Sequence, residues 1–263
     1  AVPTVADDAD VVVFITGQMH HTGNRTETYS HQFTSTWSAG SGEPTFERGD
    51  NGGNAAEVSY AVVEFTGLNW KVQRTEHNYA AAGVTETEPI TAVNSLGRTF
   101  IHAQKRYTAV SGIGNVGHEV WLSSIGAVSF EVNNLATITG VTHTSVAWII
   151  ENTQTGTGAM SVQRSSGNTT GGTEPVLISL PISTSLNSVN NASIFVTTDV
   201  NQTGDTMPRP IAGAFITSTS TYQLWRSEAS GGGVLSYRTE IVQWPAADLA
   251  IRQNYYRLYA DND

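Results

Sequence analysis

Cysteine, lysine and charge in general are scarce in this sequence. The chain contains no cysteine, which excludes disulfides, thiol nucleophiles and Cys-ligated zinc or iron–sulfur sites. Charged residues make up 14% of the 263 positions, well below the roughly 25% of ordinary soluble domains. The net charge is −10 and the only lysines are Lys71 and Lys105, so the clustered positive charge that binds phosphate backbones is missing. We therefore expect no nucleic-acid partner and a surface of Ser, Thr, Asn, Gln and Gly, which is usual for extracellular or particle-borne β-proteins.

Long apolar runs are also absent. The longest stretches, such as 11–15, extend over about five residues, whereas roughly 20 are needed to span a bilayer. The sequence thus predicts no transmembrane helix and no membrane insertion. The first residues, Ala1-Val2-Pro3, have neither the charged region nor the apolar region of a signal peptide. They fit removal of an initiator methionine and an earlier cleavage equally well.

What the sequence does contain is one pattern that occurs three times, about 86 residues apart. Each copy has three markers in the same order. The first is a phenylalanine. The second is a run of two aliphatic residues, an acid or amide and one further residue, and the third is a signature of one aliphatic residue with Gln and Arg. The phenylalanines are Phe14, Phe100 and Phe195, the runs are Val62–Phe65, Ile149–Asn152 and Ile241–Trp244, and the signatures are Val72–Arg74, Val162–Arg164 and the permuted Ile251–Gln253. With Pro3, Pro89 and Pro175 opening the copies, we expect three units at 1–88, 89–174 and 175–263.

The periodic segments of each unit predict strands. Val, Ile, Thr and aromatic residues dominate them, while Gly, Asn, Asp and Ser fill the gaps. No segment has a sustained helical period with caps at both ends. Six short strands per unit predict an all-β chain of three tandem six-stranded antiparallel β-sandwich repeats. Because each unit is small, packing between units or between chains should contribute to its stability.

The densest histidine group, His20, His21 and His31, is a candidate metal site. Adjacent residues on a strand point to opposite faces, so His20 and His21 cannot easily share one ion unless the strand has ended. We favour solvated residues at a strand end, and predict no metal and no cofactor. His102, His118 and His143 group with nothing in the sequence.

Two further motifs lie near the first glycine-rich turn. Arg48-Gly49-Asp50 spells the tripeptide of integrin-binding loops, but the repeat already explains Arg48, and Gly49-Asp50 opens a turn. The segment 50–54 lacks the spaced carboxylates and the distal Glu of a calcium loop. Ordinary turn chemistry accounts for both.

Glu64, Glu151 and Gln243 occupy one position of the repeat. A glycosidase would need paired carboxylates, but the Gln in the third copy indicates that charge is not required there. We interpret this position as a hydrogen-bonding strand residue that receives Arg74 and Arg164 from the following strand. Since hydrolase-elbow, phosphate-loop, zinc-protease and dinucleotide motifs are all missing, we expect no enzymatic activity and no catalytic residues.

Two features leave alternatives open. Acceptor patterns for N-glycans occur at Asn24, Asn168, Asn191 and Asn201, but they arise readily in this composition and matter only if the host glycosylates. The aromatic segment Tyr255–Tyr259 is either a last core strand or an arm that anchors on a neighbouring subunit, where Tyr and Arg are favoured.

The order of the motifs within the units resembles that of β-repeat proteins encoded with the structural genes of tailed bacteriophages. It is carried by Leu224–Glu228, Gly231–Gly233, Tyr60–Phe65 and Val72–Arg74. The resemblance implies a non-enzymatic virion structural protein, a capsid decoration or accessory protein, located on the particle surface or otherwise extracellular, with other virion proteins or itself as partners. The second unit departs most, with Val132 and Asn152 where Arg and an aromatic residue are expected.

A weaker likeness is to the H-type lectin sandwich, through Trp148–Glu151 and Ile241–Trp244. It implies the alternative function, a carbohydrate-binding adhesin or tail-fibre module that binds host surface glycans. Trp37, Trp121 and Trp225 do not share one repeat position, which disfavours a sugar site used three times.

Overall fold

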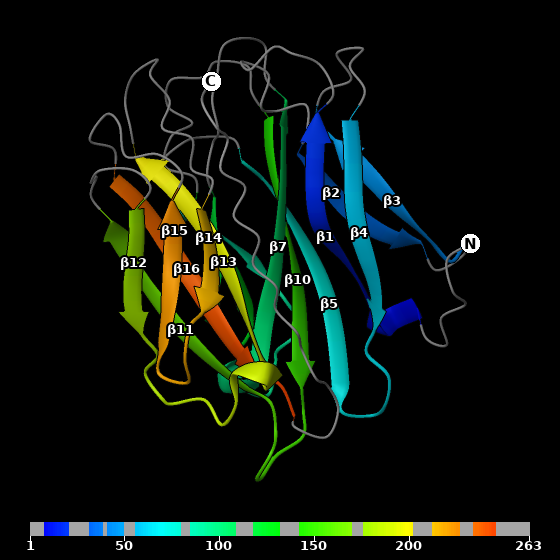
Figure 1. Cartoon of the computed structure of the whole chain (residues 1–263). Helices are drawn as coiled ribbons and strands as arrows, with labels where there is room; N and C mark the ends of the chain where they lie inside the picture. Colours follow the sequence, from blue (N-terminus) through cyan, green and yellow to red (C-terminus); the bar gives the residue numbers. More distant parts are fainter. Residues whose placement is uncertain are drawn as a thin grey trace.

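The chain folds into paired antiparallel sheets (Figure 1). The computed structural model describes residues 8–20, 32–38, 41–49, 56–79, 85–108, 118–131, 142–169, 176–201, 212–226 and 234–245. In these ranges the only helical elements are three-residue 3-10 turns: η1 (Asp8–Asp10), η3 (Leu96–Arg98) and η5 (Val189–Asn191). None of the described helices is long and apolar enough to cross a membrane. The prediction of an all-β chain of antiparallel sandwich repeats is confirmed.

Two complete six-stranded sandwiches follow each other along the chain. The central sandwich consists of β5 (Trp70–Tyr79), β6 (Thr85–Pro89), β7 (Thr99–Thr108), β8 (Glu119–Ser124), β9 (Ala127–Glu131) and β10 (Thr142–Asn152). The C-terminal sandwich consists of β11 (Ser161–Thr169), β12 (Val176–Pro181), β13 (Ala192–Asn201), β14 (Ala212–Ile216), β15 (Thr221–Arg226) and β16 (Val234–Gln243). Their inner sheets have the orders β5-β10-β7 and β11-β16-β13, and their outer sheets β6-β9-β8 and β12-β15-β14.

The N-terminal sandwich has four described strands. In its inner sheet β1 (Val11–His20) pairs with β4 (Ala56–Glu64), and in its outer sheet β2 (Phe33–Ser38) pairs with β3 (Glu43–Arg48). Among the described strands this sandwich has no counterpart of the first two strands of the others, β5 with β6 and β11 with β12.

Strand pairing groups the chain differently from the expected units. The Val72 signature lies on β5, which pairs with β10 of the central sandwich, and the Val162 signature lies on β11, which pairs with β16. Each signature therefore opens a sandwich, where we expected it to close one. The expected boundary at 88/89 falls inside β6, and Pro89 is matched by Pro181, since these residues end β6 and β12. The described sandwiches span 70–152 and 161–243.

The three marker phenylalanines are not all equivalent. In the inner sheets Glu64 pairs with Val11, Glu151 with Thr99 and Gln243 with Ala192, which aligns the three opening strands. On this alignment Phe14, His102 and Phe195 occupy one position, and Phe100 lies two residues before it. The expectation that Phe14, Phe100 and Phe195 are equivalent is right for the first and third and wrong for Phe100. All three nevertheless contact the same cluster, because a shift of two residues keeps the face of a strand.

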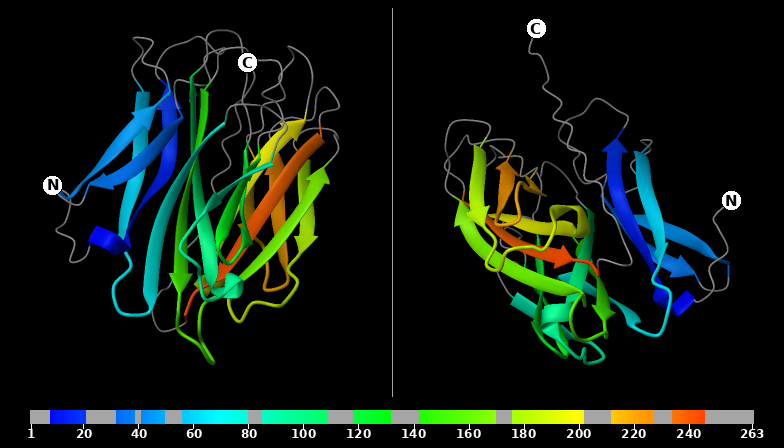
Figure 2. Two further views of the ribbon diagram at one scale, coloured as in Figure 1. Left: turned by 180° about the vertical axis from the view of Figure 1, so that it is seen from behind. Right: turned by 60° about the horizontal axis from the view of Figure 1, so that its bottom comes forward.

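Apolar side chains form a cluster inside each complete sandwich and a third one between the sandwiches. The third, the central cluster, joins the inner sheets of all three sandwiches, which lie around it in Figure 2. Its buried members are Val12, Val13, Phe65, Phe100, Val146, Trp148, Ile150, Met160, Val162, Val242 and Trp244. The sandwiches therefore share one core.

The paired aliphatic residues of the repeat divide between two cores, as strand alternation predicts. Ile149 packs inside the central sandwich while Ile150 packs in the central cluster, and both are buried. Ile241 and Val242 are divided in the same way in the C-terminal sandwich. In the N-terminal sandwich Val63 packs against the central cluster but is only partly buried. In each pair at least one member therefore packs against a core.

We expect the Ile150→Val variant to lose about 0.5–1.5 kcal/mol of unfolding free energy, because one methylene leaves a fully buried site. Val189, which is 38% exposed, provides the control, and Val189→Ala should stay within about 0.5 kcal/mol of wild type. Urea unfolding of both variants measures the difference. Equal losses would contradict the placement of Ile150 in the shared core.

Candidate functional site

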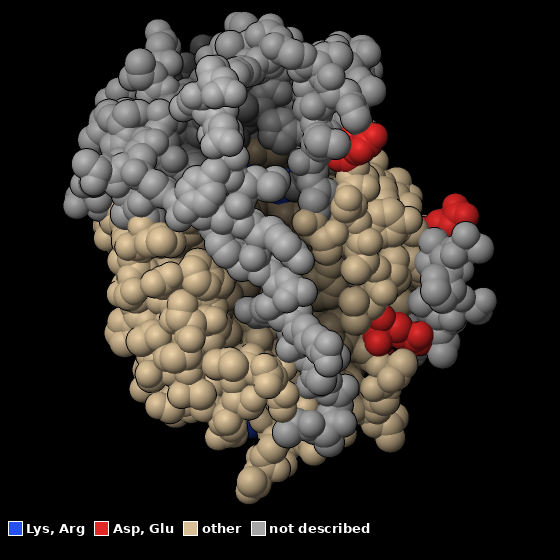
Figure 3. All heavy atoms as spheres, viewed as in Figure 1, with Lys and Arg blue, Asp and Glu red and all other residues tan. Residues whose placement is uncertain are grey.

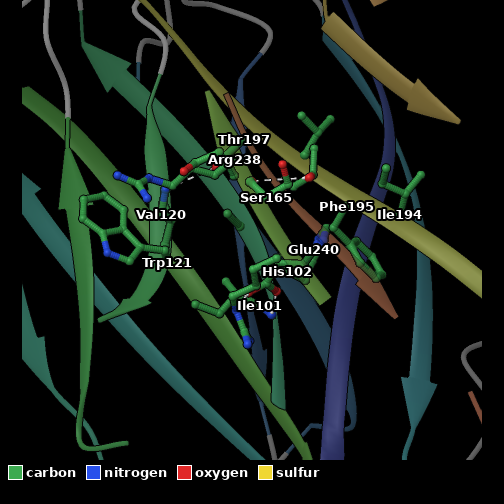
Figure 4. Close-up of a pocket in the computed structure, with 15 residues that line it drawn as sticks. Ile101, His102, Val120, Trp121, Ser165, Ile194, Phe195, Thr197, Arg238 and Glu240 are labelled. Carbon is green, nitrogen blue, oxygen red and sulfur yellow. Dashed lines mark hydrogen bonds and ion pairs between the residues drawn. The ribbon is translucent and has the colours of Figure 1, made fainter. Parts of the chain in front are cut away.

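A hollow of about 330 Å³ lies between the central and C-terminal sandwiches (Figure 4). Strands β7 and β8 line it from one side, and β11, β13 and β16 from the other. Five strands meet here because the edge strands β7 and β8 of the central sandwich lie against the face of the inner sheet β11-β16-β13. The charged side chains of the hollow come mainly from β11 and β16, where alternation points every second residue toward the neighbouring sandwich.

The first charged group of this hollow is the pair Arg164 and Glu240. Arg164 Nε donates to Glu240 Oε1 at 2.7 Å, and the second carboxylate oxygen accepts the backbone N–H of Ile101 at 2.5 Å. Arg164 also donates to the carbonyl of Leu96 at 2.7 Å and to that of Thr99. Burial raises the pKa of Glu240, and the adjacent Arg164 guanidinium opposes that shift. Since the ion pair belongs to one sandwich and its backbone partners to the other, it fastens the two together.

The second charged group is Arg238, which reaches across to β8. Its Nε donates to Glu119 Oε2 at 2.7 Å, and its guanidinium lies 3.6 Å from the centre of the Trp121 ring. The Glu119 side chain is 6% exposed and that of Arg238 is 29% exposed, so the carboxylate is withdrawn from water and the guanidinium is partly so. Cation–π contacts of this kind contribute most when they are desolvated. Each charged group of the hollow thus has a partner across or beside the junction.

Polar contacts also join the N-terminal and central sandwiches. Gln104 accepts the backbone N–H of Ser35 at 2.8 Å and donates to the carbonyl of Val13 at 2.8 Å. Arg106 pairs with Glu47 at 2.7 Å. Both junctions are therefore built in the same way, with buried side chains that hold backbone groups of the neighbour.

Three histidines lie in or near these junctions and are kept neutral. Burial lowers the pKa of His102 to about 4. Burial, with a smaller contribution from the positive charge of Lys105, lowers the pKa values of His118 and His143 well below 6.5. His118 Nδ1 lies 2.7 Å from Ser145 Oγ, which in turn lies 3.3 Å from His143 Nε2. This chain of hydrogen bonds resembles a Ser–His dyad in its residue types and distances. Ser145 is fully buried, however, and a substrate cannot reach it.

His77 is held between two carboxylates. Its Nε2 lies 2.6 Å from Glu86 and its Nδ1 lies 2.7 Å from Glu88, and the ring stacks on Phe130. The two ring nitrogens point in opposite directions, so the three residues cannot chelate one ion. They connect β5 to β6 of the opposite sheet. The alternation Glu-x-Glu on a short strand was the signal in the sequence that both acids share a face.

A second hollow, the aromatic groove, is lined by residues of all three sandwiches. It has a volume of about 860 Å³, and its aromatic lining consists of Phe14, Phe65, Trp70, Phe195 and Trp244. The ring centres of Phe65 and Trp70 are 4.9 Å apart. Trp244 Nε1 donates to Ser193 Oγ at 3.0 Å, so the polar atom of the indole is satisfied and the groove is mainly apolar.

One end of the molecule is almost without charge. The loop end comprises the loops 66–69, 90–98, 125–126, 153–160, 182–191 and 217–220, which adjoin one another through backbone hydrogen bonds such as Thr153 N to Asn69 O at 2.7 Å. Arg98 is the only charged residue in these loops. Leu68 is fully exposed, and Ile125 and Val189 are 54% and 38% exposed. The loops form the lower end in Figure 1, and Figure 3 shows the lower part of the molecule mostly in the colour of uncharged residues.

The histidine and turn motifs fall mostly outside the described residues. His20 ends β1, but His21, His31 and the segment 50–54 lie outside, as do Asn24 and Tyr255–Tyr259. Arg48 ends β3 and Gly49 follows in a bend, while Asp50 is not described. Within the described ranges no group of His, Asp or Glu side chains converges as a metal site. Of the other glycan acceptors, Asn168 is exposed on β11, Asn191 closes η5, and Asn201 ends β13.

The repeat position of Glu151 and Gln243 is a hydrogen-bond acceptor, but its partners differ from those expected. Glu151 accepts the backbone N–H of Asn94 at 2.5 Å, and Gln243 accepts that of Asn187 at 3.2 Å. The acid that pairs with Arg164 is Glu240 instead. Arg74 donates to the carbonyl of Ser35 at 3.1 Å and pairs with Glu76 at 2.8 Å. The arginines of the signature thus serve the junctions between sandwiches, and the repeat position fixes a loop.

The glutamines of the signature have matching roles that the sequence did not reveal. Gln73 Nε2 donates to the carbonyl of Thr91 at 2.9 Å, and Gln163 Nε2 to that of Thr184 at 2.6 Å. Both threonines lie shortly after the proline that ends the second strand of their sandwich.

No protein-family model, no curated protein and no solved structure matches this chain. What it does has to be inferred from its own contacts, charges and surfaces.

Proposed function

We propose that this chain is a non-enzymatic structural protein of a virus particle, a decoration or accessory protein on the capsid of a tailed bacteriophage. The observation that carries the proposal is the hollow between the central and C-terminal sandwiches. Its charged side chains, Arg164, Glu240 and Arg238, are engaged with the protein itself. An active site needs an acid, base or nucleophile that can reach a substrate. These groups instead hold two sandwiches in a fixed relative position.

The shared core supports a mechanical role. Three sandwiches that bury side chains in one central cluster form a stiff body, because packed interiors deform little. Neutral buried histidines and paired arginines add contacts that are directional. A protein that reinforces or decorates a shell needs this rigidity and a face for attachment. The phage assignment itself rests on the resemblance of the repeat cadence.

The loop end is the face that suits attachment. Its Ser, Thr, Asn and Gly side chains carry almost no charge, and Leu68, Ile125 and Val189 project from it. The buried centres of protein interfaces are depleted of charged residues. We place the contact with the capsid, or with a neighbouring virion protein, on this end.

On purified particles we expect the wild-type chain at a fixed copy number, and the Leu68→Glu variant at a clearly reduced one. Burying a carboxylate in an uncharged contact costs at least about 1.4 kcal/mol, which is tenfold in affinity. Quantitative mass spectrometry of particles incubated with subsaturating chain measures the occupancy. Thr45→Glu is the matched control, because Thr45 is exposed on β3 of the outer sheet and away from the loop end.

Two outcomes would count against the proposal. Equal occupancy of the Leu68→Glu and Thr45→Glu variants would remove the loop end as the attachment face. If the wild-type chain does not bind particles at all and is instead retained on a glycan array, the structural role fails, and the carbohydrate-binding adhesin or tail-fibre module replaces it.

The aromatic groove is the feature that favours this second candidate. Sugar-binding sites commonly present aromatic rings, and Phe14, Trp70 and Phe195 line this groove. Its polar lining includes Gln154 and Asn69, whose amides can bind hydroxyl groups. It combines residues of all three sandwiches, so it is a single site and not one that is repeated in each unit.

A further inference from the structure

A short backbone bridge joins the outer sheet of the central sandwich to the inner sheet of the C-terminal one. His118, directly before β8, donates its backbone N–H to the carbonyl of Thr198 on β13 at 2.9 Å, and the two residues form an isolated antiparallel bridge. Further along β8, the N–H of Val120 donates to Thr197 Oγ1 at 3.3 Å. These two bonds hold the start of β8 against β13, and Figure 4 shows Val120 and Thr197 at the hollow between the sandwiches.

The side chain of His118 is buried inside the central sandwich, beside other basic groups. Its Nδ1 lies 2.7 Å from Ser145 Oγ, and its ring centre lies 6.1 Å from that of His143. Lys105 is the residue opposite Ser145 in the inner sheet. Burial lowers the pKa of His118 well below 6.5, and the charges of Lys105 and His143 add to this shift. The imidazole is therefore neutral, and a proton on it would place a further positive charge in a buried site.

The acids near His118 are engaged elsewhere. Glu119 follows it in the chain, but strand alternation turns this side chain to the opposite face, where its carboxylate accepts Arg238 Nε at 2.7 Å. Glu86 and Glu88 bind the two ring nitrogens of His77. A protonated His118 is thus stabilised by hydration, and hydration requires the residue to move outward. Its backbone bond to Thr198 then breaks.

The junction between the N-terminal and central sandwiches is held by groups of a different kind. The Gln104 side chain accepts the N–H of Ser35 and donates to the carbonyl of Val13, both at 2.8 Å. An amide side chain has no proton to gain between pH 4 and 8. The ion pair of Arg106 with Glu47 lies at the surface, since the Glu47 side chain is 54% exposed. The two junctions should therefore respond differently to acid.

Two other titratable groups contribute to the junctions. His102 lies where the sandwiches meet, with its ring centre 4.6 Å from that of Phe14 and 6.4 Å from that of Phe195, so its protonation favours opening of either junction. Burial raises the pKa of Glu240, so acid neutralises this carboxylate while the junction is closed, and that proton opposes opening. His118 is the group that makes one junction more sensitive to acid than the other.

We propose that His118 is an acid-sensitive latch: its protonation frees the start of β8 from β13 and opens the junction between the central and C-terminal sandwiches, while the N-terminal and central sandwiches stay joined. This inference is independent of the attachment to particles. The closed latch is fully stable above about pH 6.5 and loses stability as the pH falls, because the proton binds to the open form. For one histidine, the ratio of open to closed molecules should rise by up to about 25-fold between pH 7 and pH 5.

Hydrogen exchange of single backbone amides in the full-length protein tests the latch. The N–H of His118 reports on one junction and the N–H of Ser35 on the other, because each donates across its junction. After correction for intrinsic exchange rates, the opening ratio of the His118 amide should rise far more steeply between pH 7 and pH 5 than that of Ser35. Equal increases in wild type would overturn the proposal, because the molecule would then open as a whole.

Two substitutions separate the latch from the general effect of buried histidines. His118→Asn keeps a polar atom near Ser145 but cannot take up a proton, so the increase at Val120, the next amide that donates across this junction, should shrink by about 25-fold. His143→Asn is the matched control, because His143 stays inside the central sandwich when the junction opens, and it should keep the wild-type increase. An unchanged increase in His118→Asn, or an equal loss in both variants, would overturn the proposal. If either variant does not fold, the comparison of His118 with Ser35 in wild type decides.

Discussion

Replacing Arg164 with alanine is expected to lower the free energy of unfolding by about 3–5 kcal/mol, because it removes one partner of a buried ion pair. Glu240, whose side chain is 9% exposed, would lose its counter-charge, and the carbonyls of Leu96 and Thr99 would lose a donor. The carboxylate would respond by taking up a proton, since its pKa is already raised by burial and the opposing guanidinium is gone. Urea unfolding at neutral pH measures the loss.

Two further variants make this prediction specific. Arg98→Ala is the matched control, because Arg98 makes one long hydrogen bond, 3.3 Å to the carbonyl of Asn152, and should cost less than about 1 kcal/mol. The double variant with Met at both 164 and 240 removes both charges together and should be more stable than Arg164→Ala. If Arg164→Ala loses no more than Arg98→Ala, the ion pair does not fasten the two sandwiches.

Acid is expected to destabilise the protein strongly between about pH 6.5 and 4. His102, His118 and His143 bind protons in the unfolded chain below about 6.5, but burial keeps them neutral in the folded protein. The unfolded state then binds more protons, so stability falls as the pH falls, by up to about 1.4 kcal/mol per pH unit for each histidine. For His102, whose folded pKa is about 4, the total reaches about 3 kcal/mol.

Glu240 acts in the opposite direction. Its pKa is raised by burial, so the folded protein takes up this proton at a higher pH than the unfolded chain does. This offsets part of the loss near the acid end of the range. The histidines still determine the net dependence of the unfolding free energy on pH, because three histidines lower it in acid and one carboxyl group raises it.

His102→Phe isolates one histidine from the others. Phenylalanine stands at this position in the N-terminal and C-terminal sandwiches, as Phe14 and Phe195, and the ring of His102 lies 4.6 Å from that of Phe14. Nε2 of His102 has no hydrogen-bond partner among the described residues, so the variant loses no bond from that atom. Chemical unfolding from pH 8 to 4 should give a shallower curve for the variant. Parallel curves would show that His102 titrates normally.

Local pattern was enough to predict the strands and the direction of their apolar residues. Ile149 and Ile150 are adjacent and both aliphatic, and alternation then requires a core on each side of the strand. The absence of helical periods predicted the all-β class in the same way. These inferences need only the chemistry of neighbouring residues.

The partner of each strand could not be predicted in this way. Val72 and its neighbours have the composition of a strand whether they pair with β4 or with β10, because β-propensity reports burial and not the identity of the neighbour. Proline was also a poor marker of the boundary. It stops the second strand at Pro89 and Pro181, whereas the regular spacing had favoured Pro175.

The contacts of the candidate site could not be predicted from the sequence, for a related reason. Arg164 and Glu240 are separated by 76 residues, and Arg238 and Glu119 by 119. Neither pair lies at matching positions of the repeat, so the periodicity gave no signal. Glu151 could be predicted to accept a hydrogen bond, but Asn94 as its donor depends on how the loop before β7 folds.

The shared central cluster also links the substitutions that the three copies can accept during evolution. Modules strung separately along a chain can accumulate substitutions independently after duplication. Here Phe100, Phe195 and Val12 contact one cluster, so a change of volume in one copy alters the surroundings of the other two. Inward positions are therefore expected to change in step among descendants of this gene, while the outer sheets drift freely. The resulting lineage would keep three unequal copies that no longer replace one another.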